Sequence, residues 1–198
     1  MAATNPLALS YLQHILTAVS VRDRSAPYRT FFDNWFAFER GGPFLNASSR
    51  PHWYNNPCPS RHGEALRRAH FISTMAARTL AGLERKRLVK DHVIPVAVLR
   101  DLLFEQQPRS IEEVRLMMQK HYRIGILAIE EDESLSRSGL RSKMPGGWMI
   151  TDSPFARYES AGIVAQDVGL YGNAVHAQLR QTASESGYRP LGRHYDNG

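Results

Sequence analysis

Residues 88–95 (LVKDHVIP) constrain the fold of this chain more than any other segment, because an apolar, β-like run ends there at a proline. Val and Ile favour strands, whereas proline interrupts a strand ladder and suits the first turn of a helix. We therefore predict a strand over residues 88–94 and a helix that begins at Pro95. A second run, residues 122–129 (YRIGILAI), predicts another strand, with an acidic helix beginning at Glu130.

Further signals predict helices around these two strands. Asn5 before Pro6 marks a helix start, and Ser110 with Glu113 forms a capping box in front of a helix over residues 111–121. Apolar spacing and start signals predict further helices over residues 28–39, 61–86, 153–158 and 173–184. The fold class that follows is α+β, mostly helical, with a small two-strand core.

The chain of 198 residues has the length of one domain of ordinary size, in which we distinguish three segments. Residues 1–60 form an N-terminal helical extension and a loop, and residues 61–170 form a basic helix plus the strand-containing core. Residues 171–198 form a C-terminal helix and tail. Proline and asparagine crowd residues 41–60, and a long irregular connection of this kind favours a functional loop.

Cysteine usage and hydropathy indicate the compartment. Cys58 is the one cysteine, so the sequence excludes an internal disulfide and a cysteine-based zinc cluster. No window approaches the roughly 20 apolar residues that a membrane span needs, and the N-terminus has no basic stretch before an apolar core. We expect a cytoplasmic protein with no membrane partner.

The positive charge of the chain is concentrated in one segment. Residues 61–90 contain eight Lys and Arg against two Glu, a net charge of 8 − 2 = +6, and the whole chain also carries +6. A local excess of this kind attracts polyanions, of which nucleic acid, DNA or RNA, is the simplest. The residues that we expect to contact phosphates are Arg67, Arg68, Arg78 and Lys143. The alternative is that this basic helix face is merely solvated.

Asp91 and His92 are the strongest candidates for chemistry. A metal-dependent phosphodiesterase needs an oxygen or imidazole ligand for its cation and a neutral imidazole that takes a proton from water. An Asp-His pair at a strand end provides both types of group. Neighbours on a regular strand point to opposite faces, however, so the pair converges on one site only if the backbone turns before Pro95. The alternative is a surface aspartate beside a hydrogen-bonded, half-buried histidine.

Four acidic residues, 130–133, follow the second strand. Acidic side chains in the first turn of a helix are favoured by the helix dipole, so a solvated helix start is the simple interpretation. A hard divalent cation also prefers such oxygen ligands. The position of these acids directly after a strand favours a role beside the end of the first strand.

The segment KDHVIP, the strand over residues 123–129 and the helix over 130–138 together resemble the core of the His-Asn-His nuclease family. That ββα-metal core has a strand ending in Asp-His or Glu-His, a second strand, and a helix with a further ligand. The resemblance covers residues 88–140. It implies that Asp91 is a metal ligand and that His92 is the general base that activates water. No Asn or His occurs between Tyr122 and Leu140, so Glu131 or a neighbouring acid takes the place of the helix ligand.

The leading hypothesis is therefore a divalent-metal-dependent endonuclease with a ββα-like core. Asp91 and Glu131 would bind the ion, with magnesium favoured over zinc or manganese, and His92 would be the catalytic residue. The alternative is a non-catalytic nucleic-acid-binding protein, such as a phage or mobile-element regulator that uses the basic segment 61–90. A third hypothesis is a helical protein whose basic face contacts an acidic protein partner. The sequence contains no G-x-S-x-G, phosphate-binding loop or dinucleotide fingerprint, which argues against several common enzyme classes.

Overall fold

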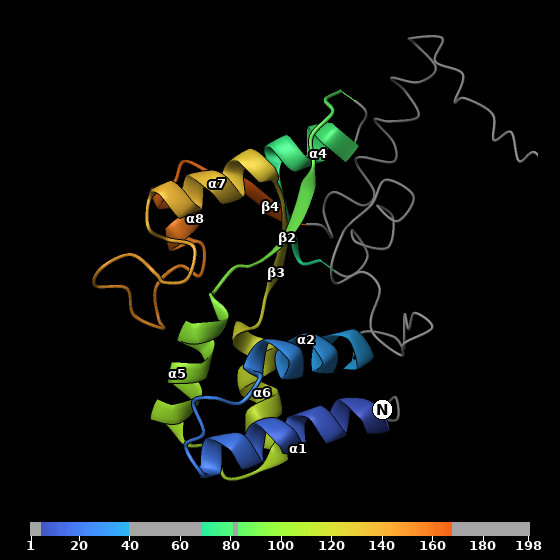
Figure 1. Ribbon diagram of the computed structural model, residues 1–198, viewed down its shortest axis with the longest axis vertical. Coiled ribbons are helices and arrows are strands. Elements are labelled where there is room, and N and C mark those ends of the chain that lie inside the picture. The colour runs from blue at the N-terminus through green and yellow to red at the C-terminus, as the bar shows by residue number, and fades with distance from the viewer. Residues whose placement is uncertain (1–4, 40–68, 81–82, 168–198) are drawn as a thin grey trace, which may run out of the picture.

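The computed structural model describes residues 5–39, 69–80 and 83–167, and the statements below concern these residues. Figure 1 shows a helical part at the bottom and a sheet-containing part at the top. The helical part consists of α1 (Pro6–Ser20), α2 (Tyr28–Glu39), α5 (Val96–Gln106) and α6 (Ile111–His121). The sheet-containing part consists of β1 (Phe71–Ser73), α4 (Thr74–Leu80), β2 (Leu88–His92), β3 (Ile124–Ala128), α7 (Ile129–Arg137), α8 (Ala156–Ser160) and β4 (Ala165–Asp167).

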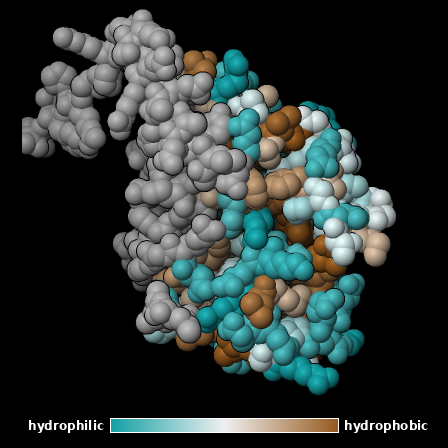
Figure 2. All heavy atoms as spheres, turned by 180° about the vertical axis from the view of Figure 1, so that it is seen from behind, coloured by the Kyte–Doolittle hydropathy of each residue, from teal (hydrophilic) through white to brown (hydrophobic). Residues whose placement is uncertain are grey.

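The helices of the lower part begin where the sequence predicts. The Asn5 side chain accepts a hydrogen bond from the Leu7 N–H at 2.9 Å, and Ser110 Oγ accepts one from the Glu113 N–H at 3.1 Å. These bonds satisfy amide groups that a helix start leaves without partners. The helices then bury apolar faces against one another, with the aromatic side chains of α2 at the centre of the shared core. On the face seen in Figure 2, hydrophilic side chains cover most of the lower half of the coloured surface.

The sheet has four strands in the order β2-β3-β1-β4. β2 runs antiparallel to β3, β3 runs parallel to β1, and β1 runs antiparallel to β4. In the β2–β3 register, Leu88 pairs with Ala128 and His92 pairs with Ile124. The last residue of β2 therefore lies beside the first residue of β3, and the start of α7 lies beside Leu88 at the other end.

Alternate residues of β3 belong to two different hydrophobic clusters. Ile124 and Ile126 pack with the helical part, whereas Leu127 packs in a second cluster with Leu135 of α7. This division follows from the two-residue period of a strand. The sheet is consequently covered on both faces, and every residue of β3 is buried.

The α+β class is confirmed, but the core is a four-stranded mixed sheet rather than a two-stranded unit. The prediction of one basic helix over residues 61–86 is wrong over residues 71–73, which form β1, and α4 ends at Leu80. The apolar spacing predicts Ile72 on a helical face, yet it pairs with Ile126 of β3 and Gln166 of β4. Long-range pairing overrides the local helical spacing here, because three residues are too few to show a strand period.

The remaining predictions divide between confirmed elements and residues outside the described ranges. The strand after residue 88 is confirmed, although it ends at His92, two residues earlier than predicted. The second strand and the helix after it are β3 and α7. The loop 41–60, the helix 173–184 and the tail lie outside the described residues. No helix in the described part of the chain is long and apolar enough to cross a membrane.

Candidate functional site

Successive residues of β2 point to opposite faces of the sheet, which separates the Asp-His pair. Lys90 and His92 point toward α2, where they meet Asp33. Asp91 points the other way and meets Arg157 and Tyr158 of α8. Each half of the pair is therefore bonded to its own partners, and we call the two groups the Asp33 centre and the Asp91 centre.

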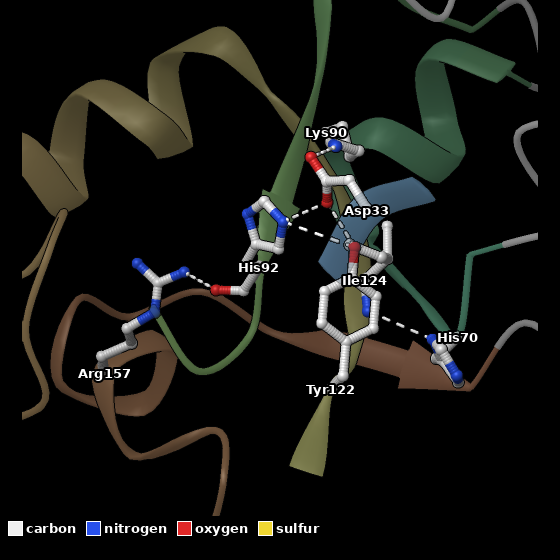
Figure 3. A network of polar contacts seen from close by, with 7 residues as sticks. All are labelled: Asp33, His70, Lys90, His92, Tyr122, Ile124 and Arg157. Carbon is white, nitrogen blue, oxygen red and sulfur yellow. Dashed lines mark hydrogen bonds and ion pairs between the residues drawn. The ribbon is translucent and has the colours of Figure 1, made fainter. Parts of the chain in front are cut away.

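The Asp33 centre lies between the helical part and the sheet, and Figure 3 shows it at close range. Asp33 Oδ1 lies 2.6 Å from His92 Nε2 and accepts a hydrogen bond from the Tyr122 hydroxyl, while Oδ2 accepts one from Lys90 Nζ at 2.9 Å. The Asp33 residue is 1% exposed and His92 is 4% exposed. Four polar side chains thus satisfy one another in a nearly dry environment, as buried polar groups must.

Burial and neighbouring charge set the protonation states of this centre. Burial raises the pKa of Asp33, but the His92 ring and the Lys90 ammonium, both bonded to its carboxylate, hold that pKa below its ordinary value. Burial lowers the pKa of His92 and outweighs the opposing effect of Asp33. At neutral pH we therefore assign a carboxylate to Asp33 and a neutral ring to His92. A carboxylate only accepts hydrogen bonds, so His92 Nε2 carries the ring hydrogen.

The Asp91 centre is organised by a fully buried arginine. Arg157 donates through Nε to the Val93 carbonyl at 2.9 Å and through Nη1 to the Leu140 carbonyl at 3.1 Å. Its Nη2 donates to the His92 carbonyl and to Asp91 Oδ2, which also accepts from the Tyr158 hydroxyl at 2.6 Å. The Asp91 side chain is 14% exposed, whereas that of Arg157 is 0% exposed.

A pocket of about 380 Å³ opens beside both centres, between the helical part and the sheet. Asp91 and His92 line it, together with Arg29, Arg100 and Arg141, which come from α2, α5 and the loop after α7. The first residues of α5 and the residues at the start of α2 also line this pocket. We call it the arginine pocket.

The His92 ring has one nitrogen left for chemistry. Nε2 bonds Asp33, and Nδ1 has no hydrogen-bond partner among the described residues. Figure 3 shows Nδ1 pointing away from Asp33, on the side where Arg157 lies. Because His92 lines the arginine pocket, this is the arrangement of an oriented base, in which a carboxylate fixes the tautomer and the second nitrogen accepts a proton.

Glu131 does not lie beside this pair. The β2–β3 register places the start of α7 next to Leu88, and about 13 Å of strand, at about 3.3 Å per residue, separates Leu88 from His92. Glu131 Oε2 accepts hydrogen bonds from Ser73 Oγ and, at 2.8 Å, from the Ala128 N–H. Burial raises the pKa of this carboxyl. Glu131 thus serves the start of α7 rather than the arginine pocket.

The groups predicted to bind a metal ion are consequently not brought together. No three His, Cys, Asp or Glu side chains within the described ranges are arranged to hold an ion. Asp91 offers one carboxylate oxygen that is not bonded to Arg157 or Tyr158, and His92 offers Nδ1. This donor set does not fit the predicted ion, and the divalent cation stays a prediction.

Two of the four predicted phosphate-contacting residues, Arg78 and Lys143, lie in the described part of the chain. Arg67 and Arg68 lie outside the described residues. Arg78 bonds Glu84 at 2.5 Å, and Lys143 is exposed in the loop after α7 without lining the pocket. Within the described residues 69–80 and 83–90, the basic residues are divided between α4, the connection after it and β2.

Sequence spacing does not identify several residues of the site, because their partners are distant in the chain. Asp33 is 59 positions from His92, and Arg157 is 66 positions from Asp91. One clue is available for Asp33, because it is a charged residue within the otherwise aromatic run FFDNWF of a predicted helix. A charged side chain on such a buried face needs a partner.

No protein-family model, curated protein or solved structure matches this chain. The resemblance to the His-Asn-His family therefore stays a prediction based on residues 88–140.

Proposed function

We propose that this protein binds nucleic acid, with its phosphates in the arginine pocket. The observation that carries the proposal is that three arginines from three separate segments line one pocket beside Asp91 and His92. Guanidinium groups match the geometry of phosphate oxygens and keep their charge at any physiological pH.

The charge balance of the pocket supports an anionic ligand. Asp91 is the one acidic residue in the lining, and its charge is opposed by Arg157. Arg100 bonds Asp101 at 3.0 Å, and Arg141 lies 3.7 Å from Asp132. Arg29 has no ion-pair partner among the described residues. A positive field remains at the pocket mouth, where it draws in anions.

Helix geometry adds unpaired amide donors to this field. Pro95 caps α5 without a side-chain hydrogen bond, and the first intrahelical bond is donated by the Leu99 N–H to the Pro95 carbonyl. The N–H groups of residues 96–98 therefore lack partners within the helix, and residues 96 and 97 line the pocket. Amide groups at a helix N-terminus bind phosphate, and here they act beside the arginines.

The size of the pocket and the surrounding charge favour a nucleic acid over a larger anion such as a folded acidic protein. A volume of about 380 Å³ is at the small end for ligand sites and suits one nucleotide unit. Arg85 and Arg87 are exposed and have no ion pair among the described residues, so they provide additional positive charge on the chain.

Salt-dependent binding of labelled oligonucleotides tests the proposal. Arg29→Ala and Arg141→Ala should each weaken binding and reduce the slope of log affinity against log salt by about one unit for each phosphate that the variant no longer binds. Arg137→Ala is the matched control, because Arg137 is an exposed arginine on α7 that does not line the pocket. Equal affinities and slopes for all four proteins would rule out this pocket as the binding site.

A divalent-metal-dependent nuclease is the second candidate, favoured by the position of His92. His92 lines the pocket with Nδ1 unpaired among the described residues, as a base that activates water requires. Cleavage of plasmid and single-stranded substrates in Mg²⁺, Mn²⁺ or Zn²⁺ tests this activity, with His92→Ala and Asp91→Ala beside the unmodified protein. Equal cleavage by all three would mean that the activity lies elsewhere.

A further inference from the structure

We infer that the arginine pocket is an RNA-cleaving site, in which His92 takes the proton of a ribose 2′-hydroxyl and the arginines stabilise the phosphate. This inference rests on the proposed nucleic-acid binding and goes beyond it by naming the substrate class and the reaction. Such a reaction needs a base, a counter-charge for the phosphorus centre and a nucleophile.

The base is His92, held by the Asp33 centre. Both oxygens of Asp33 are occupied, by His92 and Tyr122 on Oδ1 and by Lys90 on Oδ2, so the carboxylate cannot rotate without breaking these bonds. The hydrogen bond from Nε2 fixes the tautomer in which Nδ1 holds the lone pair. Burial keeps the ring neutral by lowering the pKa of His92. His92 is therefore a base of fixed orientation, and Asp33 is its positioning residue.

The counter-charge for the phosphate comes from the three arginines. Arg29, Arg100 and Arg141 converge on the pocket, so guanidinium groups are available to stabilise the phosphorane-like transition state. Asp91 has only one oxygen outside its bonds to Arg157 and Tyr158, and Glu131 belongs to the other end of β2. The residues present thus supply cationic side chains at the place where a hydrolytic nuclease would gather carboxylates around an ion.

The nucleophile is the 2′-hydroxyl of the substrate itself. Transfer of the 2′-hydroxyl proton to His92 Nδ1 lets the 2′-oxygen form a bond to the adjacent phosphorus. The bond from phosphorus to the 5′-oxygen breaks, and that oxygen takes a proton from water while His92 returns its proton to solvent. The products are a 2′,3′-cyclic phosphate and a 5′-hydroxyl, with no other reactant. DNA lacks the 2′-hydroxyl and cannot react in this way.

The test uses a DNA oligonucleotide with one ribonucleotide and an all-DNA oligonucleotide of the same sequence, both in EDTA. The unmodified protein should cleave the first after its ribonucleotide and leave the second intact, and mass spectrometry should show the cyclic phosphate. His92→Gln should lower the rate by about 10²–10⁴-fold, the usual contribution of a general base. Arg29→Ala, at an exposed residue, should also slow cleavage without unfolding the protein, whereas Arg137→Ala should not.

Each other outcome overturns the inference in a recognisable way. Cleavage that needs a divalent ion and leaves no cyclic phosphate would support the metal-dependent nuclease instead. Binding of both oligonucleotides without cleavage would reject the reaction and leave the proposed binding function intact. Binding of neither would reject both. Cleavage by folded His92→Gln at the unmodified rate would show that His92 is not the base.

Discussion

The Asp33 centre and the Asp91 centre contain the same kinds of groups on opposite faces of one strand. Each consists of an aspartate, a cation and a tyrosine hydroxyl that bonds the aspartate. The two centres differ in which charged group is buried at the middle of the hydrogen-bond network. In the first, the carboxylate of Asp33 is buried and collects donors, whereas in the second Arg157 is buried and collects acceptors.

The difference shows that an aspartate, a cation and a tyrosine can either fix the orientation of one side chain or hold separate chain segments together. Asp33 fixes the orientation of the His92 ring through Nε2, and His92 also lines the arginine pocket. Arg157 bonds three backbone carbonyls from two segments and so holds the end of β2, the loop after α7 and α8 together. We therefore expect the Asp91 centre to matter most for stability and the Asp33 centre to matter for both stability and chemistry.

The largest effect should come from removing the buried arginine. Arg157→Met leaves the carbonyls of Val93 and Leu140 and the carboxylate of Asp91 without this donor, and should lower the free energy of unfolding by about 4–5 kcal/mol. Urea unfolding followed by circular dichroism measures this decrease, with Arg137→Met, on the surface of α7, as the control. A decrease below about 1 kcal/mol would contradict the joining role of Arg157.

A smaller decrease should follow Asp33→Asn. The change removes the carboxylate charge that Lys90 contacts at 2.9 Å inside the protein, and should cost about 3 kcal/mol. The double variant Asp33→Asn with Lys90→Met should recover part of that stability, because it also removes the buried ammonium charge that Asp33 balances. Additive effects in the same unfolding assay would show that the two side chains are not energetically coupled.

The sequence predicts the elements whose signals are local. The Asn5 cap, the Ser110–Glu113 capping box and the two apolar runs locate helices and strands, because each signal and its consequence lie within a few residues. The three-residue strands β1 and β4 escape prediction, because they exist only through pairing with distant partners. The hydrophobic period within such a short segment gives no information about pairing with distant strands.

The dependence on distant partners also explains which residues of the site the sequence predicts. Asp91 and His92 stand out as a dipeptide, and both line the pocket. Their separation onto opposite faces follows from the strand period, which the sequence also indicates. The partners Asp33 and Arg157 depend on tertiary packing over more than 50 positions, so the pattern could not supply them. The position of Glu131 after a strand predicts it near His92, but the antiparallel register places it at the other end.

A moderate effect is expected for Asp91→Asn. The substitution removes the negative charge of Asp91 that faces Arg157. Arg157 keeps its three carbonyl acceptors, and the Asp91 side chain is partly exposed. The free energy of unfolding should fall by about 1–2 kcal/mol, the cost of weakening one partly buried, charged hydrogen bond. Thermal and urea unfolding check the ranking, and a decrease equal to that of Arg157→Met would mean that the ion pair, rather than the carbonyl bonds, dominates this centre.

The smallest effect separates the two centres by pH, because the Asp33 centre contains a histidine. Burial lowers the pKa of His92 in the folded protein. Below about pH 6.5, His92 therefore binds a proton more readily in the unfolded chain than in the folded one. Stability should therefore fall as pH falls from 7.5 to 6, by at most about 0.8 kcal/mol from this residue alone. Asp33 acts in the same direction only at lower pH. Its lowered pKa stabilises the fold above about pH 3.8, and that contribution disappears as its carboxylate is protonated.

Unfolding curves of the unmodified protein and of His92→Gln between pH 7.5 and 6 measure this effect. The free energy of unfolding should fall more steeply with falling pH for the unmodified protein than for His92→Gln. His121, whose pKa burial also lowers, is present in both proteins and cancels in the comparison. Parallel curves would mean that folding leaves the pKa of His92 unchanged, so that burial would not be what keeps this ring neutral as the base of the arginine pocket.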